Sequence, residues 1–143
     1  MKAKFGAAGA AVVLAIVLAL GVSELRVKRT YWDALGGVWT VCAGVTGEGV
    51  VPGRTYTDAE CQAMEAAYVR RMLTSMGKCV AGEFDFNVIK AFGHFAYNVG
   101  TANFCGSTAA KLLNRGDVAG ACKQILRWVY IKGKDCRDPR NKC

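Results

Sequence analysis

The sequence predicts an α+β domain that is mostly helical, with a small β-hairpin lobe near its start and a hydrophobic helix before that lobe. Three observations predict this class. Residues 5–22 form an uncharged apolar run, residues 36–51 are rich in Gly, Val and Thr, and apolar residues recur at helical spacing through much of the remainder. The 143 residues, 52% of them hydrophobic, suffice for one domain with a sizeable core.

The apolar run at residues 5–22 follows two lysines. Eighteen residues is close to the lower limit for a membrane span, and half of these are Gly or Ala, so the run is weakly hydrophobic. A cleaved signal peptide and an uncleaved anchor both fit, and the length of the run favours the anchor. We therefore expect a signal-anchor segment at 1–22, with the lysines in the cytoplasm, and a globular domain at 23–143 outside it.

The globular part is expected to start with charged residues 24–29, which could continue the N-terminal helix. A Gly-Gly turn then leads into a short strand at 38–42. Three further helices are predicted from capping residues and apolar spacing. The first begins at the capping box Thr57–Glu60, the second covers residues 84–100, and the third starts at Ser107. A last helix is expected from Asp117 to Tyr130, and the tail beyond it is polar and non-periodic.

Composition limits the chemistry. The 19 basic residues outnumber the 11 acidic ones, which gives a net charge of +8. This charge favours binding to nucleic acid, anionic lipid or an anionic cell wall, or it only keeps a basic surface soluble. Seven cysteines without a C-x-x-C or Cys/His cluster predict disulfides in an oxidising compartment, with at least one cysteine left over. No metal and no cofactor are expected.

Two carboxylates lie near the start of the globular part. Glu24 and Asp33 are nine residues apart, and Thr40 follows on the predicted strand. One helix end and one hairpin can bring these groups together. Glycoside hydrolysis needs such a set, because one acid protonates the leaving oxygen while a second carboxylate and polar groups hold water or stabilise charge. His94, the only histidine, is expected to be a hydrogen-bonded core or flank residue.

These motifs resemble the phage-type, T4-lysozyme-like glycoside hydrolases, and more closely their signal-arrest-release endolysins. Glu24, Tyr31 and Asp33 stand at the family spacing. The resemblance covers about residues 2–134. The other segments that match the family pattern are Gly37–Thr40, Cys42–Gly47, Phe95–Gly100, Phe104–Thr108 and Arg127–Trp128.

The resemblance implies a monomeric muramidase. It would cleave the β-1,4 bond between N-acetylmuramic acid and N-acetylglucosamine in peptidoglycan, with inversion. Glu24 would be the general acid, Asp33 would position or activate water, and Thr40 would help to hold that water. Residues expected to contact the glycan strand are Tyr31, Asn98, Gly100, Ser107 and Trp128.

The resemblance also gives residues 5–22 a role. In the signal-arrest-release group, a weak anchor holds the enzyme inactive on the bacterial inner membrane, with its catalytic domain in the periplasm, and then leaves the bilayer. Some members regulate activity by cysteine exchange, which makes Cys42 a candidate regulatory thiol. A structural disulfide or a buried thiol is the favoured interpretation of Cys42.

The chain departs from the family pattern in several places. Leu25 replaces a Gly, Arg26 lies one place early, and Val45 replaces a His. The interval from Asp33 to Thr40 is one residue longer. The usual C-terminal helix is not found before Cys143, so we expect a truncated or divergent member.

Three alternatives remain. A catalytically defective, membrane-anchored cationic protein could bind the wall, but it would not need Glu24 or Asp33. A lytic transglycosylase needs one acid and could dispense with Asp33. A nucleic-acid binder would suit the charge, but the anchor places the domain on the wrong side of the membrane, so we expect no nucleic-acid partner.

Overall fold

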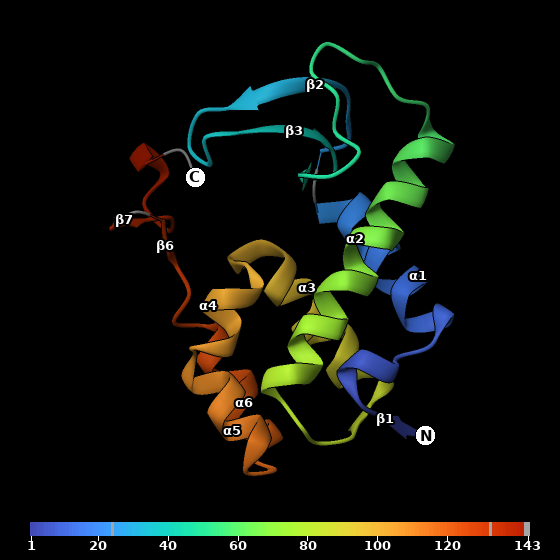
Figure 1. Ribbon diagram of the computed structural model, residues 1–143. Coiled ribbons are helices and arrows are strands. Elements are labelled where there is room, and N and C mark those ends of the chain that lie inside the picture. The colour runs from blue at the N-terminus through green and yellow to red at the C-terminus, as the bar shows by residue number, and fades with distance from the viewer. Residues whose placement is uncertain (24, 132, 142–143) are drawn as a thin grey trace.

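The computed structural model describes residues 1–23, 25–131 and 133–141. Helices form a body at one end, a small sheet lies at the other, and the long helix α2 runs between them (Figure 1). The helices are α1 (Ala10–Ser23), α2 (Asp58–Cys79), α3 (Phe86–Val99), α4 (Thr101–Cys105), α5 (Thr108–Asn114) and α6 (Val118–Ile125), with 3-10 turns η1 (Phe5–Ala7) and η2 (Pro139–Asn141). The strands are β1 (Lys2–Ala3), β2 (Val27–Asp33), β3 (Val38–Cys42), β4 (Val45–Thr46), β5 (Phe84–Asp85), β6 (Tyr130–Ile131) and β7 (Lys134–Asp135).

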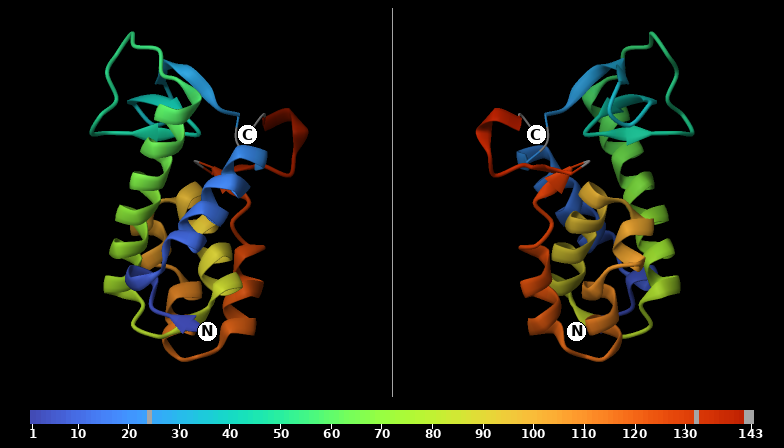
Figure 2. Two further views of the ribbon diagram at one scale, coloured as in Figure 1. Left: turned by 90° about the vertical axis from the view of Figure 1, so that its right-hand side faces the viewer. Right: turned by 90° about the vertical axis from the view of Figure 1, so that its left-hand side faces the viewer.

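The N-terminal apolar run belongs to the core of the helical body. Helix α1 contacts both α2 and α3, and the three lie together (Figure 2). The ring of Phe5 packs against those of Phe84 and Phe104. No helix in the described part of the chain is both long enough and apolar enough to cross a bilayer. The apolar residues of this segment that are buried are Phe5, Val12, Val13, Ile16, Val17 and Leu20.

Glycines allow this segment to pack closely. A Cβ on Gly77 of α2 would lie 2.8 Å from the backbone nitrogen of Gly6, and a Cβ on Gly93 of α3 would lie 2.6 Å from Cδ1 of Ile16. A side chain at Gly77 would push the backbone of the N-terminal segment away, and one at Gly93 would displace the end of the Ile16 side chain. Gly77 therefore allows the close approach of η1 to α2, and Gly93 leaves room for the Ile16 side chain against α3.

The opposite end of the molecule is the sheet β2–β3–β4, which is antiparallel throughout. A small buried cluster includes Val41 and Val45 of this sheet together with Tyr56, and the disulfide Cys42–Cys61 joins β3 to α2. A second disulfide, Cys79–Cys105, joins α2 to α4, and Cys136 is also disulfide-bonded. Cys122 is the free cysteine of the described residues, and it is exposed.

The α+β class is confirmed, as are three predicted helix starts. Thr57 and Glu60 form the predicted capping box of α2, each side chain bonding to the other's backbone N–H. The Ser107 hydroxyl caps α5 by accepting a hydrogen bond from the N–H of Ala110. The Asp117 carboxylate caps α6 by accepting a hydrogen bond from the N–H of Gly120. All three starts were predictable because a cap depends on residues three apart.

Two predicted helical segments are wrong. Residues 27–29 begin strand β2 rather than continuing α1, because the carbonyl of Lys28 accepts the N–H of Tyr56 and the N–H of Thr30 donates to the carbonyl of Arg54. Helix α6 ends at Ile125, well before Tyr130. The polar tail then forms the β6–β7 hairpin with Gly133 at φ +77°, a backbone angle that favours glycine.

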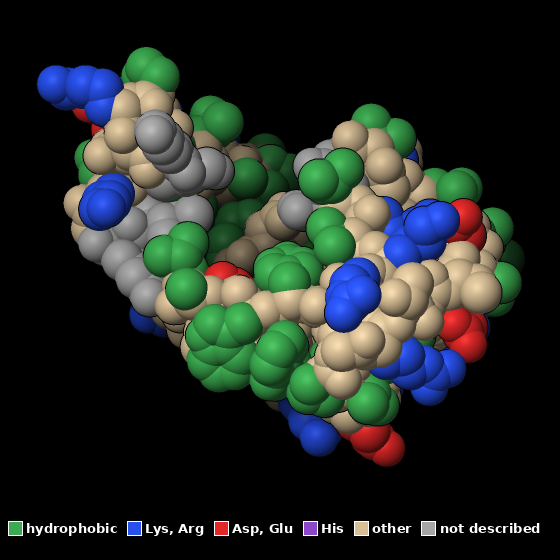
Figure 3. Space-filling model, turned by 90° about the horizontal axis from the view of Figure 1, so that it is seen from above, with side chains coloured by type: hydrophobic (Ala, Val, Ile, Leu, Met, Phe, Trp, Pro, Cys, Tyr) green, Lys and Arg blue, Asp and Glu red, His purple; other side chains and the backbone are tan. Residues whose placement is uncertain are grey.

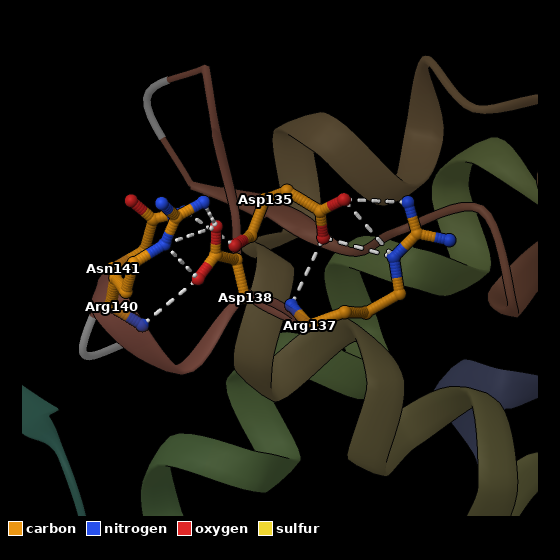
Figure 4. A network of polar contacts seen from close by, with 5 residues as sticks. All are labelled: Asp135, Arg137, Asp138, Arg140 and Asn141. Atoms are coloured by element: carbon orange, nitrogen blue, oxygen red, sulfur yellow. Dashed lines mark hydrogen bonds and ion pairs between the residues drawn. The ribbon is translucent and has the colours of Figure 1, made fainter.

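The tail carries the same ion pair twice (Figure 4). The Asp135 carboxylate accepts hydrogen bonds from the guanidinium and the N–H of Arg137, and Asp138 accepts the same set from Arg140. The amide of Asn141 donates to the carbonyl of Asp135 at 2.7 Å, which links the two units. The bonds from Arg137, chiefly from its side chain, lower the pKa of Asp135 from 3.8 to about 2.

We therefore predict acid-sensitive order in this tail. The folded-state pKa of Asp135 is lowered, so its ionised carboxylate stabilises the folded tail. This stabilisation is complete above about pH 4 and is lost as the pH falls through about 2. In Arg137→Gln, the carboxyl pKa is expected to rise toward 3.8. Carboxyl ¹³C NMR titration of both proteins checks this, and equal pKa values would contradict it.

Candidate active site

The β2–β3 hairpin places two of the predicted catalytic residues. Tyr31 pairs with Thr40, Trp32 with Trp39, and Asp33 with Val38. Side chains alternate between the faces of a sheet, so Asp33 and Thr40 are diagonal neighbours on one face. The two tryptophans lie on the other face, with their rings edge to face at 5.7 Å.

Asp33 is held by the turn that follows it. Its Oδ1 accepts the N–H of Leu35 at 3.0 Å, and its carbonyl accepts the N–H of Gly37 at 2.7 Å. Gly37 has φ +67°, and a Cβ on Gly36 would lie 2.7 Å from Oδ2 of Asp33. The Gly-Gly pair therefore both makes the turn and leaves room for this half-buried carboxylate.

Thr40 is only 3% exposed. It stands between Tyr31 and Thr46 in the three-stranded sheet, and its hydroxyl donates to the carbonyl of Val38 at 3.4 Å. This long bond is a weak restraint. Glu24, the predicted general acid, lies outside the described residues.

An ion pair between Arg26 and the buried carboxylate of Glu65 lies beside this set. The carboxylate of Glu65, on α2, accepts hydrogen bonds from Arg26 and from the N–H of Ala43. The bond to Glu65 raises the pKa of Arg26 above its ordinary value. Glu65 was not among the predicted site residues, because a lone acid on a long helix gives no local signal of burial.

The predicted glycan contacts fall into separate groups. Ser107 and Trp128 line one pocket of about 470 Å³ with polar neighbours that include Gln124 and Arg127. The Ser107 hydroxyl is engaged in the helix cap and in a 2.6 Å bond to the carbonyl of Phe104. Trp128 is partly exposed and meets the ring of Phe95 edge to face. Thr108, Gln124, Arg127 and Tyr130 also line this pocket and were not among the predicted contacts.

The remaining predicted contacts lie elsewhere. Tyr31 is exposed on the hairpin. Exposed Asn98 lies at the end of α3, where its amide donates to the carbonyl of His94. Gly100 joins α3 to α4 with φ +86°. Viewed from above, the surface on the hairpin side is hollowed near its centre, with hydrophobic side chains in the hollow (Figure 3). Such a concave surface is suited to a ligand.

Cys42 is fixed in this structure. It is 1% exposed, bonded to Cys61, and has φ +59°. Any regulatory exchange at Cys42 would have to open this disulfide. Within residues 1–23, 25–131 and 133–141, no three His, Cys, Asp or Glu side chains gather in a way that could hold a metal ion.

Known proteins are similar to most of this chain. The phage lysozyme family model matches residues 23–140. A SAR-endolysin of Bacteriophage PS119 is 37% identical over 132 residues, 88% of this chain and 78% of the relative. A SAR-endolysin of Enterobacteria phage P21 is 35% identical over 130 residues, 88% and 79% of the two chains. The crystal structure of a P22 lysozyme mutant has a TM-score of 0.71 at 22% identity, covering 94% of this chain and 92% of that one.

Proposed function

The chain belongs to the phage lysozyme family, and we propose that it is an endolysin that hydrolyses the β-1,4 bond between N-acetylmuramic acid and N-acetylglucosamine in bacterial peptidoglycan. The family match over residues 23–140 carries this proposal, because that range includes both candidate carboxylates and the hydroxyl of Thr40. Clearing of purified peptidoglycan by the full chain, beside Glu24→Gln, tests it.

In the proposed mechanism, Glu24 donates a proton to the leaving glycosidic oxygen. Asp33 positions or activates a water molecule on the opposite side of the sugar, and Thr40 helps to hold that water. Direct attack by water inverts the anomeric carbon. The fixed orientation of the Asp33 carboxylate within its turn supports this role, since a base must be aligned before the reaction. Tyr31, Asn98, Gly100, Ser107 and Trp128 are proposed to contact the glycan.

The enzyme is proposed to act in the periplasm after release from the host inner membrane. Residues 1–22 would anchor it first, and the catalytic domain at 23–143 would become active when they leave the bilayer. Two observations support this order: half of residues 5–22 are Gly or Ala, and helix α1 forms part of the folded core. A helix in the bilayer cannot fill that core. Exchange of the Cys42–Cys61 disulfide is a further candidate control.

Asp33 separates hydrolysis from lytic transglycosylase chemistry, which needs no activated water. Asp33→Ala is expected to lower the clearing rate by at least about 100-fold, because the water loses its base. Clearing rate and product reducing ends are measured together. Full activity of a folded Asp33→Ala protein would instead favour the transglycosylase.

A further inference from the structure

We propose that Arg26 and Glu65 act as a positioning pair that holds the chain next to Glu24 in register with the hairpin. The proposal rests on the proposed function, in which Glu24 is the general acid. Neither residue needs to touch the substrate. The pair would act through the backbone that it fixes.

The first observation is the burial of Glu65. Its side chain is 0% exposed, on a helix whose other charged residues face solvent. A carboxylate taken out of water is costly unless its oxygens are bonded. Here Oε1 accepts from Nε of Arg26 at 3.0 Å and from the N–H of Ala43 at 3.1 Å, while Oε2 accepts from Nη2 of Arg26 at 2.7 Å. Two parallel bonds from a guanidinium fix distance and angle together.

The second observation is that the two residues bonded to Glu65 lie close in sequence to the proposed catalytic residues. Arg26 lies two residues after Glu24 and immediately before β2, whereas Ala43 lies three residues after Thr40. The carbonyl of Ala43 also accepts a hydrogen bond from the Tyr97 hydroxyl on α3. One carboxylate on α2 therefore ties together the two segments that carry the proposed catalytic groups, and α3 supports one of them.

Other ion pairs between these regions are different in kind. Lys28 meets Asp58 at 3.5 Å and Arg54 meets Glu60 at 3.0 Å, and all four side chains are 41–69% exposed. Exposed pairs contribute little. A buried pair can often be replaced by uncharged residues of similar size without loss of stability. What the Arg26–Glu65 pair adds is therefore fixed geometry, which matters where a small displacement of an acid costs much of the rate.

The test separates geometry from stability in the full chain. In Arg26→Met/Glu65→Gln, the amide still accepts the N–H of Ala43 and no buried charge is left alone, but the link to residue 26 is cut. We expect a cooperative thermal transition near that of the parent, kcat lowered about 100-fold and KM little changed. The pH profile of kcat should also shift, because the surroundings of the acid change. A purely structural role would move neither kcat nor this profile in a folded protein.

Two further variants keep the test decisive. Lys28→Gln/Asp58→Asn removes an exposed β2–α2 pair and should keep parental activity. Arg26→Lys keeps a cation beside Glu65 but not two parallel donors, so kcat should fall about tenfold. If the double variant does not fold, this variant alone tests the positioning role. Parental kcat and pH profile in a folded double variant, or in Arg26→Lys when only that folds, would overturn the positioning role.

Glu24→Gln distinguishes failure of this proposal from failure of the proposed function. If Glu24→Gln is inactive while the folded double variant is fully active, only the positioning pair is refuted. If Glu24→Gln clears peptidoglycan as the parent does, the assignment of the general acid is refuted, and the positioning role with it.

Discussion

Glu24→Gln is expected to lower peptidoglycan clearing by at least about 100-fold, the usual share of a general acid. The amide has nearly the same shape as the acid but cannot donate a proton to the leaving oxygen, so wall binding should persist while hydrolysis stops. Turbidity of a peptidoglycan suspension and sedimentation of bound protein measure the two effects separately.

The matched control for this variant is Glu48→Gln, which makes the same chemical change at an exposed position of the sheet lobe. It should clear at the parental rate. Equal clearing by the parent and Glu24→Gln would remove Glu24 from the mechanism. No clearing by a folded parent would favour the catalytically defective wall-binding protein.

Deleting residues 1–22 is expected to prevent stable folding. The deletion removes six buried apolar side chains from Phe5 to Leu20. Burying side chains of this kind contributes about 1.5–3 kcal/mol each, or roughly 9–18 kcal/mol in total. The whole stability of a domain is about 5–15 kcal/mol. Circular dichroism and thermal unfolding of residues 23–143 beside the full chain check this.

Point variants on α1 separate the loss of packing from the loss of length. Ile16 is 0% exposed and Leu18 is 57% exposed on the same helix. Ile16→Asp should unfold the protein, because it buries an unpaired charge, and Leu18→Asp should leave Tm nearly unchanged. A cooperative transition at the parental Tm for residues 23–143, or for Ile16→Asp, would show that α1 is dispensable to the core. Activity assays should therefore use the full chain.

The sequence by itself determined the features that depend on neighbouring residues. The α+β class follows from local periodicity, the starts of α2 and α5 from capping residues at Thr57 and Ser107, and the hairpin from Gly36 and Gly37. The spacing of Asp33 and Thr40 on the hairpin was readable for the same reason, since strand register follows from the turn. The motif set also predicted the family.

The tertiary structure decided what depends on contacts between distant segments. Residues 27–29 became a strand because residues 54–56 pair with them, and nothing near residues 27–29 shows that partner. Helix α1 is apolar on every side, so its sequence fits a membrane or a core equally well, and only its packing against α2 and α3 selects the core here. The charge of Glu65 favours solvent by itself, and it is buried because Arg26 and Ala43, far away in the sequence, supply its hydrogen bonds.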